Sequence, residues 1–245
     1  MNDKRSYVRN MFGRIAPRYD LLNRLMSMGM DQAWRRRAAQ LALEGSSDSP
    51  CALDLATGTG DLIIALDECK PGTRVVGLDL TYEMLALAPN KLAGSPAGTH
   101  ALGLINGDGL DLPFPDNTFD AITSAFMLRN LVDVERGFRE MVRVTRPGGR
   151  IVALEITRPR LPVWRALFEL YFYRMVPILG GIISGDPGAY SYLPNSLQRF
   201  ISPEELAATM ARAGVRDVRW VLLNLGTVAI HYGVKPFVKI GLHNP

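Results

Sequence analysis

The sequence predicts an α/β fold in which a mostly parallel, seven-stranded sheet is covered by helices on both faces. Seven short apolar runs follow one another along the chain, and the first five are almost continuously apolar, as expected for strands buried on both faces. Helical stretches separate these five runs, which is the pattern of successive βαβ units. A glycine-rich turn directly follows the first run, as it does at the ligand-binding edge of such sheets.

Each element can be placed from its local pattern. The strands are predicted at 51–56, 74–80, 101–106, 119–126 and 150–156, and after a long interval at 215–223 and 227–234. Helices are predicted from about Asp61, Thr81 and Asp133, the last ending at Thr145–Gly149, where Pro-Gly-Gly turns the chain into the next strand. A closing helix begins at about Ser202, because Ser-Pro-Glu-Glu is typical of a helix start.

Two further segments complete a single predicted domain over residues 1–245. Residues 1–45 read as an N-terminal helical lid of two or three helices, with Pro17 near one helix start and Gly29 as a break. Residues 157–200 are an insertion rich in aromatic residues and prolines. We predict that these two segments flank a core at 50–156 along the chain. A closing helix and strands at 201–236 follow the insertion.

Composition excludes several classes of protein. The 245 residues are 47% hydrophobic and 21% charged, and no apolar run is long and uncharged enough to cross a bilayer, so one soluble domain is expected. Cys51 and Cys69 form no CxxC motif, and His100, His231 and His243 lack partners at ligand spacing, so no metal site is predicted. The polar, basic N-terminal segment lacks the apolar stretch of a signal peptide, which predicts a cytoplasmic protein with reduced cysteines.

The charge balance is mildly positive. Lys and Arg number 28 against 24 Asp and Glu, and they are dispersed, so no nucleic-acid partner is predicted. The single run of three consecutive basic residues, Arg35 to Arg37, is interpreted as the solvated face of a helix rather than a phosphate site. A weak attraction to an anionic membrane surface is compatible with this charge.

The glycine turn is the sharpest local signal. Gly58 and Gly60 let the backbone approach a ligand, and the helix that follows offers free N–H groups. The next strand ends at Asp79, where a carboxylate can accept hydrogen bonds from ribose hydroxyls. The third glycine of a nicotinamide fingerprint is missing because Ile63 takes its place. The turn therefore predicts a nucleoside ligand more than a pyrophosphate.

Four segments together, DLATGTGD, GLDL, GDGLDLPFPDNTFD and VTRPGGR, resemble the Rossmann-like class I S-adenosylmethionine-dependent methyltransferases. The resemblance implies S-adenosylmethionine as cofactor. Its amino-acid end would lie on Asp54 and the turn, its ribose on Asp79, and its adenine on Asp108 and the backbone of Gly109. A simple turn-forming role is the alternative for Asp108. The implied contacts are Asp54, Gly58, Thr59, Gly60, Asp79, Asp108, Gly109 and Ala125.

Three more specific segments, at 11–27, 126–130 and 228–236, resemble the ubiquinone/menaquinone biosynthesis C-methyltransferase family, with a likeness that covers residues 8–236. Members methylate a ring carbon of a prenylated quinol, and the menaquinone step, demethylmenaquinol to menaquinol, is the expected one. The chain departs from the family at Ala125, where a serine contact with the cofactor is common. Strand alternation directs Ser124 to the opposite face, so Ser124 is not expected to replace it.

The chemistry needs alignment of the acceptor carbon with an activated methyl group and stabilisation of a quinol oxyanion. Arg129 follows the fourth strand and is predicted to stabilise that charge, unless it only forms a surface salt bridge with Asp133. Asn130 would orient the quinol oxygen. Tyr19, with Asp20, would approach from the lid, or else Tyr19 only packs there. We interpret His231 as a hydrogen-bonded strand residue rather than a base.

The insertion fits a lipid-like acceptor. Its apolar residues recur at helical spacing and predict one broad apolar face that packs on the core or meets a membrane, made of Trp164, Leu167, Phe168, Tyr171 and Met175. The expected partners are thus a prenylated quinol, a peripheral contact with the inner face of the membrane, and a second copy of the chain. The alternative acceptors are a polyprenyl benzoquinol, a phytyl naphthoquinol, RNA, protein or another small molecule. The alternatives to a methyltransferase are a nicotinamide oxidoreductase and a noncatalytic binding module.

Overall fold

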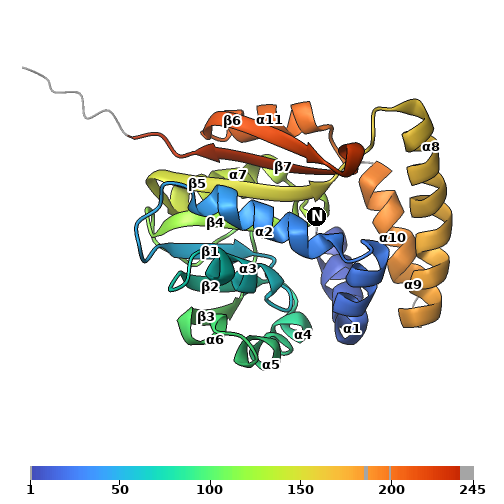
Figure 1. Cartoon of the computed structure of the whole chain (residues 1–245), viewed down its shortest axis with the longest axis horizontal. Helices are drawn as coiled ribbons and strands as arrows, with labels where there is room; N and C mark the ends of the chain where they lie inside the picture. Colours follow the sequence, from blue (N-terminus) through green and yellow to red (C-terminus); the bar gives the residue numbers. More distant parts are fainter. Residues whose placement is uncertain (1, 185–186, 199, 238–245) are drawn as a thin grey trace, which may run out of the picture.

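The computed structural model describes residues 2–184, 187–198 and 200–237. In this part of the chain, seven strands form a sheet in the order β3-β2-β1-β4-β5-β7-β6 (Figure 1). All seven predicted strands are confirmed, although β5 begins five residues earlier than expected. The strands are β1 (Cys51–Leu55), β2 (Arg74–Asp79), β3 (Ala101–Asn106), β4 (Phe119–Ala125), β5 (Thr145–Ile156), β6 (Arg216–Leu223) and β7 (Val228–Val234).

The sheet is mostly parallel, as predicted. Strands β1 to β5 pair in parallel, whereas β7 lies antiparallel between β5 and β6. The short turn η3 (Asn224–Gly226) joins β6 to β7, and so short a connection can only join antiparallel neighbours. The chain leaves β1 toward β2 and β3 and then returns to β4 on the other side of β1. Connections therefore diverge between β1 and β4, where open α/β sheets bind their ligands.

Helices cover both faces of the sheet, which confirms the predicted layers. The first face is covered by α2 (Met30–Leu43) and α3 (Asp61–Cys69), and the second by α7 (Val134–Val144) and α11 (Pro203–Arg212). The side chain of Asp133 caps α7 by accepting from the Arg136 N–H at 2.8 Å. Ser202 and Glu205 cap α11 reciprocally, as the Ser-Pro-Glu-Glu sequence predicts.

Three predicted boundaries are wrong for local reasons. The helix expected from Thr81 is broken into α4 (Tyr82–Leu85), α5 (Ala88–Ala93) and α6 (Ala97–His100), because Pro89, Gly94 and Pro96 interrupt it. The helix after Asp133 ends at Val144, and the Pro-Gly-Gly segment already belongs to β5. Pro17 lies inside α1 (Asn2–Met26) instead of near a helix start. The break expected at Gly29 is confirmed, with φ at 77°.

The lid helix α1 packs against the insertion. Figure 1 shows α8 (Pro162–Leu170), α9 (Val176–Ser184) and α10 (Pro187–Gln198) beyond the strand ends, on the side where α1 lies. A separate apolar cluster joins the two segments through Met11, Ile15, Leu22, Phe168, Phe172 and Val176. Within the described ranges, no helix is both long enough and apolar enough to span a bilayer.

The apolar face predicted for the insertion is only partly right. Phe168 is buried, whereas Leu167 and Met175 are about half exposed. The π-helical turn η2 (Tyr171–Met175) follows α8 directly, and a π-turn takes up more residues than an α-turn. The inward position therefore moves from Phe168 to Phe172 and Val176, and Met175 is left outside.

Candidate active site

The glycine turn has an unusual backbone. Ala56, Gly58 and Gly60 all have positive φ, at 54°, 57° and 91°, which glycine adopts easily and alanine at a cost of about 1–2 kcal/mol. A Cβ added at Gly58 would meet the ring of Tyr19 at 3.9 Å, so glycine is needed there chiefly for its conformation. Because Gly60 caps α3, the N-terminal end of this helix lies at the carboxyl edge of the sheet, where the first N–H groups of a helix are free for a ligand.

Asp79 is held firmly beside this turn. Its Oδ2 accepts from the Gly58 N–H and its Oδ1 accepts from the Thr81 N–H, both at 2.8 Å. Burial raises the pKa of Asp79. The side chain lines a cavity of about 110 Å³ together with Asp108, Gly109 and Ala125. Two backbone donors thus fix the carboxylate orientation that the predicted ribose contact requires.

Asp54 lies beneath the turn rather than in that cavity. Its Oδ1 accepts from the Thr123 hydroxyl at 2.9 Å, whereas its Oδ2 has no hydrogen-bond partner among the described residues. Burial raises the pKa of Asp54 to about 7. An unsatisfied buried acceptor costs roughly 1–3 kcal/mol, so this oxygen marks a place for a donor.

Asp108 forms the turn that its sequence permits and also lines the smaller cavity. Its Oδ1 accepts from the Leu110 N–H at 3.0 Å, which is a turn-forming contact. Its Oδ2 lies 3.2 Å from Nε of Arg5 on the lid helix. Ala125 faces the same cavity, and Ser124 does not, in agreement with strand alternation.

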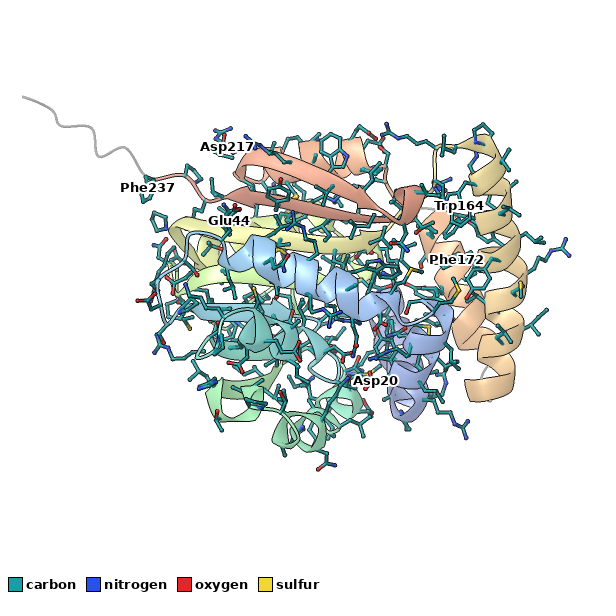
Figure 2. All side chains as sticks on the ribbon, in the orientation of Figure 1. Asp20, Glu44, Trp164, Phe172, Asp217 and Phe237 are labelled. Atoms are coloured by element: carbon teal, nitrogen blue, oxygen red, sulfur yellow. The ribbon has the colours of Figure 1, made fainter. Side chains whose placement is uncertain are left out.

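A second, much larger cavity of about 630 Å³ adjoins the first. Its lining is mostly apolar and comes from α1, α2, the insertion and the β6–β7 turn. Figure 2 shows Trp164 and Phe172 on the side of the insertion that faces this space. Four residues line both cavities: Phe12, Tyr19, Phe126 and Asn130. The two spaces therefore meet where the predicted catalytic residues lie.

Arg129 forms a buried ion pair next to this junction. Its Nη1 lies 2.9 Å from Glu155 Oε2, and both side chains are almost fully buried. The alternative, a surface salt bridge with Asp133, is wrong, because Asp133 caps α7 instead. Glu155 also accepts from the Leu128 N–H at 2.6 Å. The Nε of Arg129 has no partner among the described residues, and Arg129 lines the larger cavity.

Tyr19 and Asn130 flank the junction from opposite sides. Tyr19 packs edge-on against Phe12, with ring centroids 5.9 Å apart, and burial raises the pKa of its hydroxyl. Asn130 lies in the 3-10 turn η1 (Leu128–Asn130), where its Nδ2 donates to the Phe126 carbonyl and its Oδ1 accepts from the Tyr192 hydroxyl, both at 3.2 Å. Asn130 is thus held in one orientation by the strand end and the insertion.

His231 lines neither cavity. Its Nε2 lies 2.9 Å from the Pro203 carbonyl and its ring stacks on Trp220. Burial lowers the pKa of His231 to about 4. This confirms its interpretation as a hydrogen-bonded strand histidine, which joins β7 to the start of α11.

Comparison with known proteins adds to this geometry. A model of the ubiE/COQ5 methyltransferase family matches residues 1–235. The chain belongs to this family. It is 50% identical to a demethylmenaquinone methyltransferase of Thermus thermophilus, over 92% of this chain and 100% of that protein. It is 42% identical to the ubiquinone/menaquinone biosynthesis C-methyltransferase UbiE of Geobacter sulfurreducens, over 96% of this chain and 91% of that protein.

Solved structures agree on the fold. A SAM-dependent methyltransferase from Thermotoga maritima superposes with a TM-score of 0.61 at 17% identity, covering 93% of this chain and 99% of that chain. The predicted family, the class I methyltransferase fold and the enzyme class are confirmed. This member of the ubiE/COQ5 family is a methyltransferase.

Sequence reasoning missed two buried charged residues next to the junction of the two cavities, Arg35 beside Phe126 and Glu155 beside Arg129. Arg35 is buried and pairs with Asp31 at 2.6 Å, so the solvated-face interpretation holds only for Arg36 and Arg37. The i,i+4 spacing of Asp31 and Arg35 was a usable signal. Glu155, the partner of Arg129, stands at the carboxyl end of a buried strand, where a carboxylate is uncommon without a partner.

Proposed function

We propose that this protein transfers the methyl group of S-adenosylmethionine to a ring carbon of a prenylated quinol, converting demethylmenaquinol to menaquinol. The observation that carries the proposal is the meeting of two unlike cavities at Phe12, Tyr19, Phe126 and Asn130. The smaller has a fixed carboxylate and a glycine turn, as a nucleoside requires. The larger is apolar, as a polyprenyl chain requires. The names of the curated relatives support the choice of acceptor.

The residues beside the smaller cavity fit the proposed cofactor. Asp79 would accept from the ribose hydroxyls with the lone pairs that its two backbone donors leave free. Asp108 and the Gly109 backbone would contact the adenine. Asp54 Oδ2, to which none of the described residues donates, fits the ammonium of the amino-acid group. Bound there, the cofactor supplies an already activated methyl group. The remaining task of the protein is alignment and exclusion of water.

At the junction, Arg129 would stabilise the negative charge on the quinol oxygen next to the reacting carbon. Its Nε has no hydrogen-bond partner among the described residues, and Glu155 holds its other end, so the guanidinium is oriented before the acceptor binds. Asn130 would donate to or accept from the same oxygen, held by Tyr192 and the Phe126 carbonyl. Tyr19 would close the junction from the lid, since its ring lies over Gly58.

The larger cavity has an apolar rim, which we define as Met28, Leu167 and Leu225. These residues line the cavity and yet are 75%, 53% and 65% exposed. Exposed apolar side chains also lie on α1 and on α9, which packs against it, at Leu21, Leu25, Ile178 and Leu179. Such a patch with exposed arginines on α8 and η2 is suited to peripheral contact with an anionic membrane face. The prenyl tail would enter there.

Methyl transfer from isotopically labelled S-adenosylmethionine to short-chain demethylmenaquinol, with the matching benzoquinol alongside under reducing conditions, tests the proposal. Labelled menaquinol is the expected product. Preferential labelling of the benzoquinol would assign the ubiquinone step instead, a second candidate because relatives such as that of Geobacter sulfurreducens carry both quinones in their names. Labelling of neither quinol by a protein that binds the cofactor would reject the quinol function.

A further inference from the structure

The lid helix places one carboxylate directly on the glycine turn. Thr59 Oγ1 donates to Asp20 Oδ1 at 2.7 Å, and Lys91 Nζ on α5 lies 2.7 Å from Asp20 Oδ2. Lys91 also donates to Thr59 Oγ1 at 3.0 Å. Figure 2 shows Asp20 on the side of α1 that is turned toward the sheet. A hydroxyl and an ammonium together thus hold a carboxylate at this place.

Lys91 can pair with one carboxylate in addition to that of Asp61. Lys91 Nζ lies 2.5 Å from Asp61 Oδ1. Asp61 is shared with Arg35 at 3.8 Å, but Arg35 has a closer partner of its own in Asp31. If Asp20 left, Lys91 and Thr59 would lose an acceptor, and another carboxylate could replace it without changing the net charge. Asp20 and Lys91 are partly exposed, at 38% and 25%, so such a replacement needs no deep rearrangement.

This carboxylate lies next to the smaller cavity. Gly58 lines that cavity and precedes Thr59, and Tyr19 lines it and precedes Asp20. Thr59, Asp20 and Lys91 themselves do not line it. With about 110 Å³, this space is much smaller than its apolar neighbour of about 630 Å³. Asp20 therefore covers the glycine turn directly beside the smaller cavity.

We propose that Lys91 and Thr59 bind the carboxylate of the cofactor's amino-acid group, and that Asp20 occupies the same place, so that the cofactor binds by exchanging its carboxylate for that of Asp20. This inference rests on the proposed function and adds Lys91 to its binding residues. The ammonium and the carboxylate of one amino-acid group then go to Asp54 and Lys91, two groups of opposite charge.

The exchange also links the cofactor to the acceptor side. Asp20 and Tyr19 are neighbours on α1, and Tyr19 lines both cavities. Release of Asp20 from Thr59 and Lys91 removes two polar contacts of α1, one with the glycine turn and one with α5. Cofactor binding would thereby change how tightly the lid closes the junction where the quinol is methylated.

Calorimetric binding of two ligands to the whole protein tests the proposal. The first is S-adenosylhomocysteine; the second is its decarboxylated analogue, which keeps the adenosine and the amine. Lys91→Met is expected to weaken the first ligand about 10- to 100-fold, the effect of one charge-assisted hydrogen bond, and to leave the second unchanged. Lys91→Arg should restore most of the loss. Lys70→Met, which alters a lysine bound to Ser46 instead, is the matched control with no effect on either ligand.

Asp20→Asn shows whether Asp20 competes with the cofactor or binds it, because the two roles change the affinity in opposite directions. Removal of an internal competitor should raise the affinity for S-adenosylhomocysteine at least about threefold, because the competent state becomes more populated, and should leave the decarboxylated analogue unaffected. A lower affinity for S-adenosylhomocysteine in Asp20→Asn would make Asp20 a ligand and overturn the exchange. An equal effect of Lys91→Met on both ligands, or on neither, would remove Lys91 from the site. Failure of both ligands to bind the unaltered protein would instead reject the proposed function itself.

Discussion

Phe126 is the residue around which the buried cations of the junction gather. The guanidinium carbons of Arg35 and Arg129 lie 5.6 and 5.7 Å from its ring centroid, within the range of cation–π attraction. Its φ is 60°, a conformation that costs a bulky residue roughly 1–3 kcal/mol. The Phe126 N–H donates to the Leu154 carbonyl at 2.8 Å, which helps to hold it. The strained backbone thus turns the chain from β4 and aims Phe126 between the two cavities.

Arg129→Lys tests whether a positive charge is sufficient at this junction or whether the planar guanidinium group is needed. Lysine keeps the positive charge but lacks the planar fork that contacts Glu155 and the cavity together. We expect kcat for quinol methylation to fall about 100-fold, the lower end of the usual effect of losing one preorganised donor, because lysine retains the charge. Affinity for S-adenosylhomocysteine should not change, because Arg129 does not line the smaller cavity. Steady-state kinetics and calorimetry measure the two effects, and the exposed Arg136→Lys is the control. An unchanged kcat would remove Arg129 from the reaction.

Asp54 predicts a pH dependence of cofactor binding. Its pKa is raised to about 7 by burial, and an ammonium group binds the ionised carboxylate. Affinity for S-adenosylhomocysteine should therefore rise about tenfold per pH unit up to pH 7 and then level off. Asp54→Asn should remove this slope, whereas Asp48→Asn, on an exposed residue, should retain it. Calorimetry between about pH 5.5 and 8, a range that brackets this pKa, measures both, and a slope that survives in Asp54→Asn would contradict the role.

At the scale of elements, the site depends on where the chain reverses its direction across the sheet. The turns after β1 and β4 diverge at neighbouring strand ends, and they carry the glycine turn and η1. Strand β2 brings Asp79, its last residue, to the same edge. Helix α1 then lies over these ends with Tyr19 on Gly58. Each contributing segment is short, so rigid strands set the distances between the functional side chains.

The contact between β7 and α11 predicts a stability change at low pH. His231 has a pKa lowered to about 4 in the folded protein, against an ordinary value of 6.5. Because the folded value is the lower one, the unfolded chain binds the proton first, and stability falls as pH drops from about 6.5 toward 4. Between pH 7.5 and 5 the loss from this group is about 2 kcal/mol. Urea unfolding of the protein and of His231→Gln should differ by this amount in their pH dependence, and parallel profiles would contradict it.

At the scale of the whole molecule, the apolar rim stands out because two of its members are strained as well as exposed. Met28 and Leu225 have φ values of 52° and 55°, where asparagine is more at ease than a long apolar residue. Neither side chain gains much burial. Exposed apolar residues in this conformation are better explained by contact with a lipid surface or a prenyl chain than by folding stability.

The double variant Met28→Asn, Leu225→Asn tests this. Its melting temperature should be unchanged or higher, while partition onto vesicles rich in phosphatidylglycerol should fall about tenfold, from the loss of two apolar contacts with lipid. Sedimentation with vesicles measures the partition. Leu102→Ser, which removes an exposed leucine from strand β3, is the control and should partition as the unaltered protein does. Equal partition of all three proteins would exclude the rim as a membrane contact.

The succession of elements was predictable from the chain alone, because apolar periodicity, caps and turn residues act over a few neighbouring positions. The seven strands, the break at Gly29 and the capped start of α11 belong to this class. The last residue of the helix after Asp133 and the continuity of α1 through Pro17 were not predictable. That helix ends at Val144 because Thr145 already pairs with Phe119 of β4. At Pro17, packing of Val8, Met11, Ile15 and Leu22 outweighs a local penalty of about 3 kcal/mol.

The sequence by itself determined the sheet, the glycine turn, Asp79 at the end of the next strand, and the segments by which the family is recognised. Only the tertiary structure decided that Arg129 pairs with Glu155, that Arg35 is buried, that two cavities meet at Phe126, and that Asp20 lies on Thr59. The physical reason is distance along the chain. Local signals act over about one or two helical turns, whereas these contacts join residues from separate elements, whose side chains meet only after the sheet has formed.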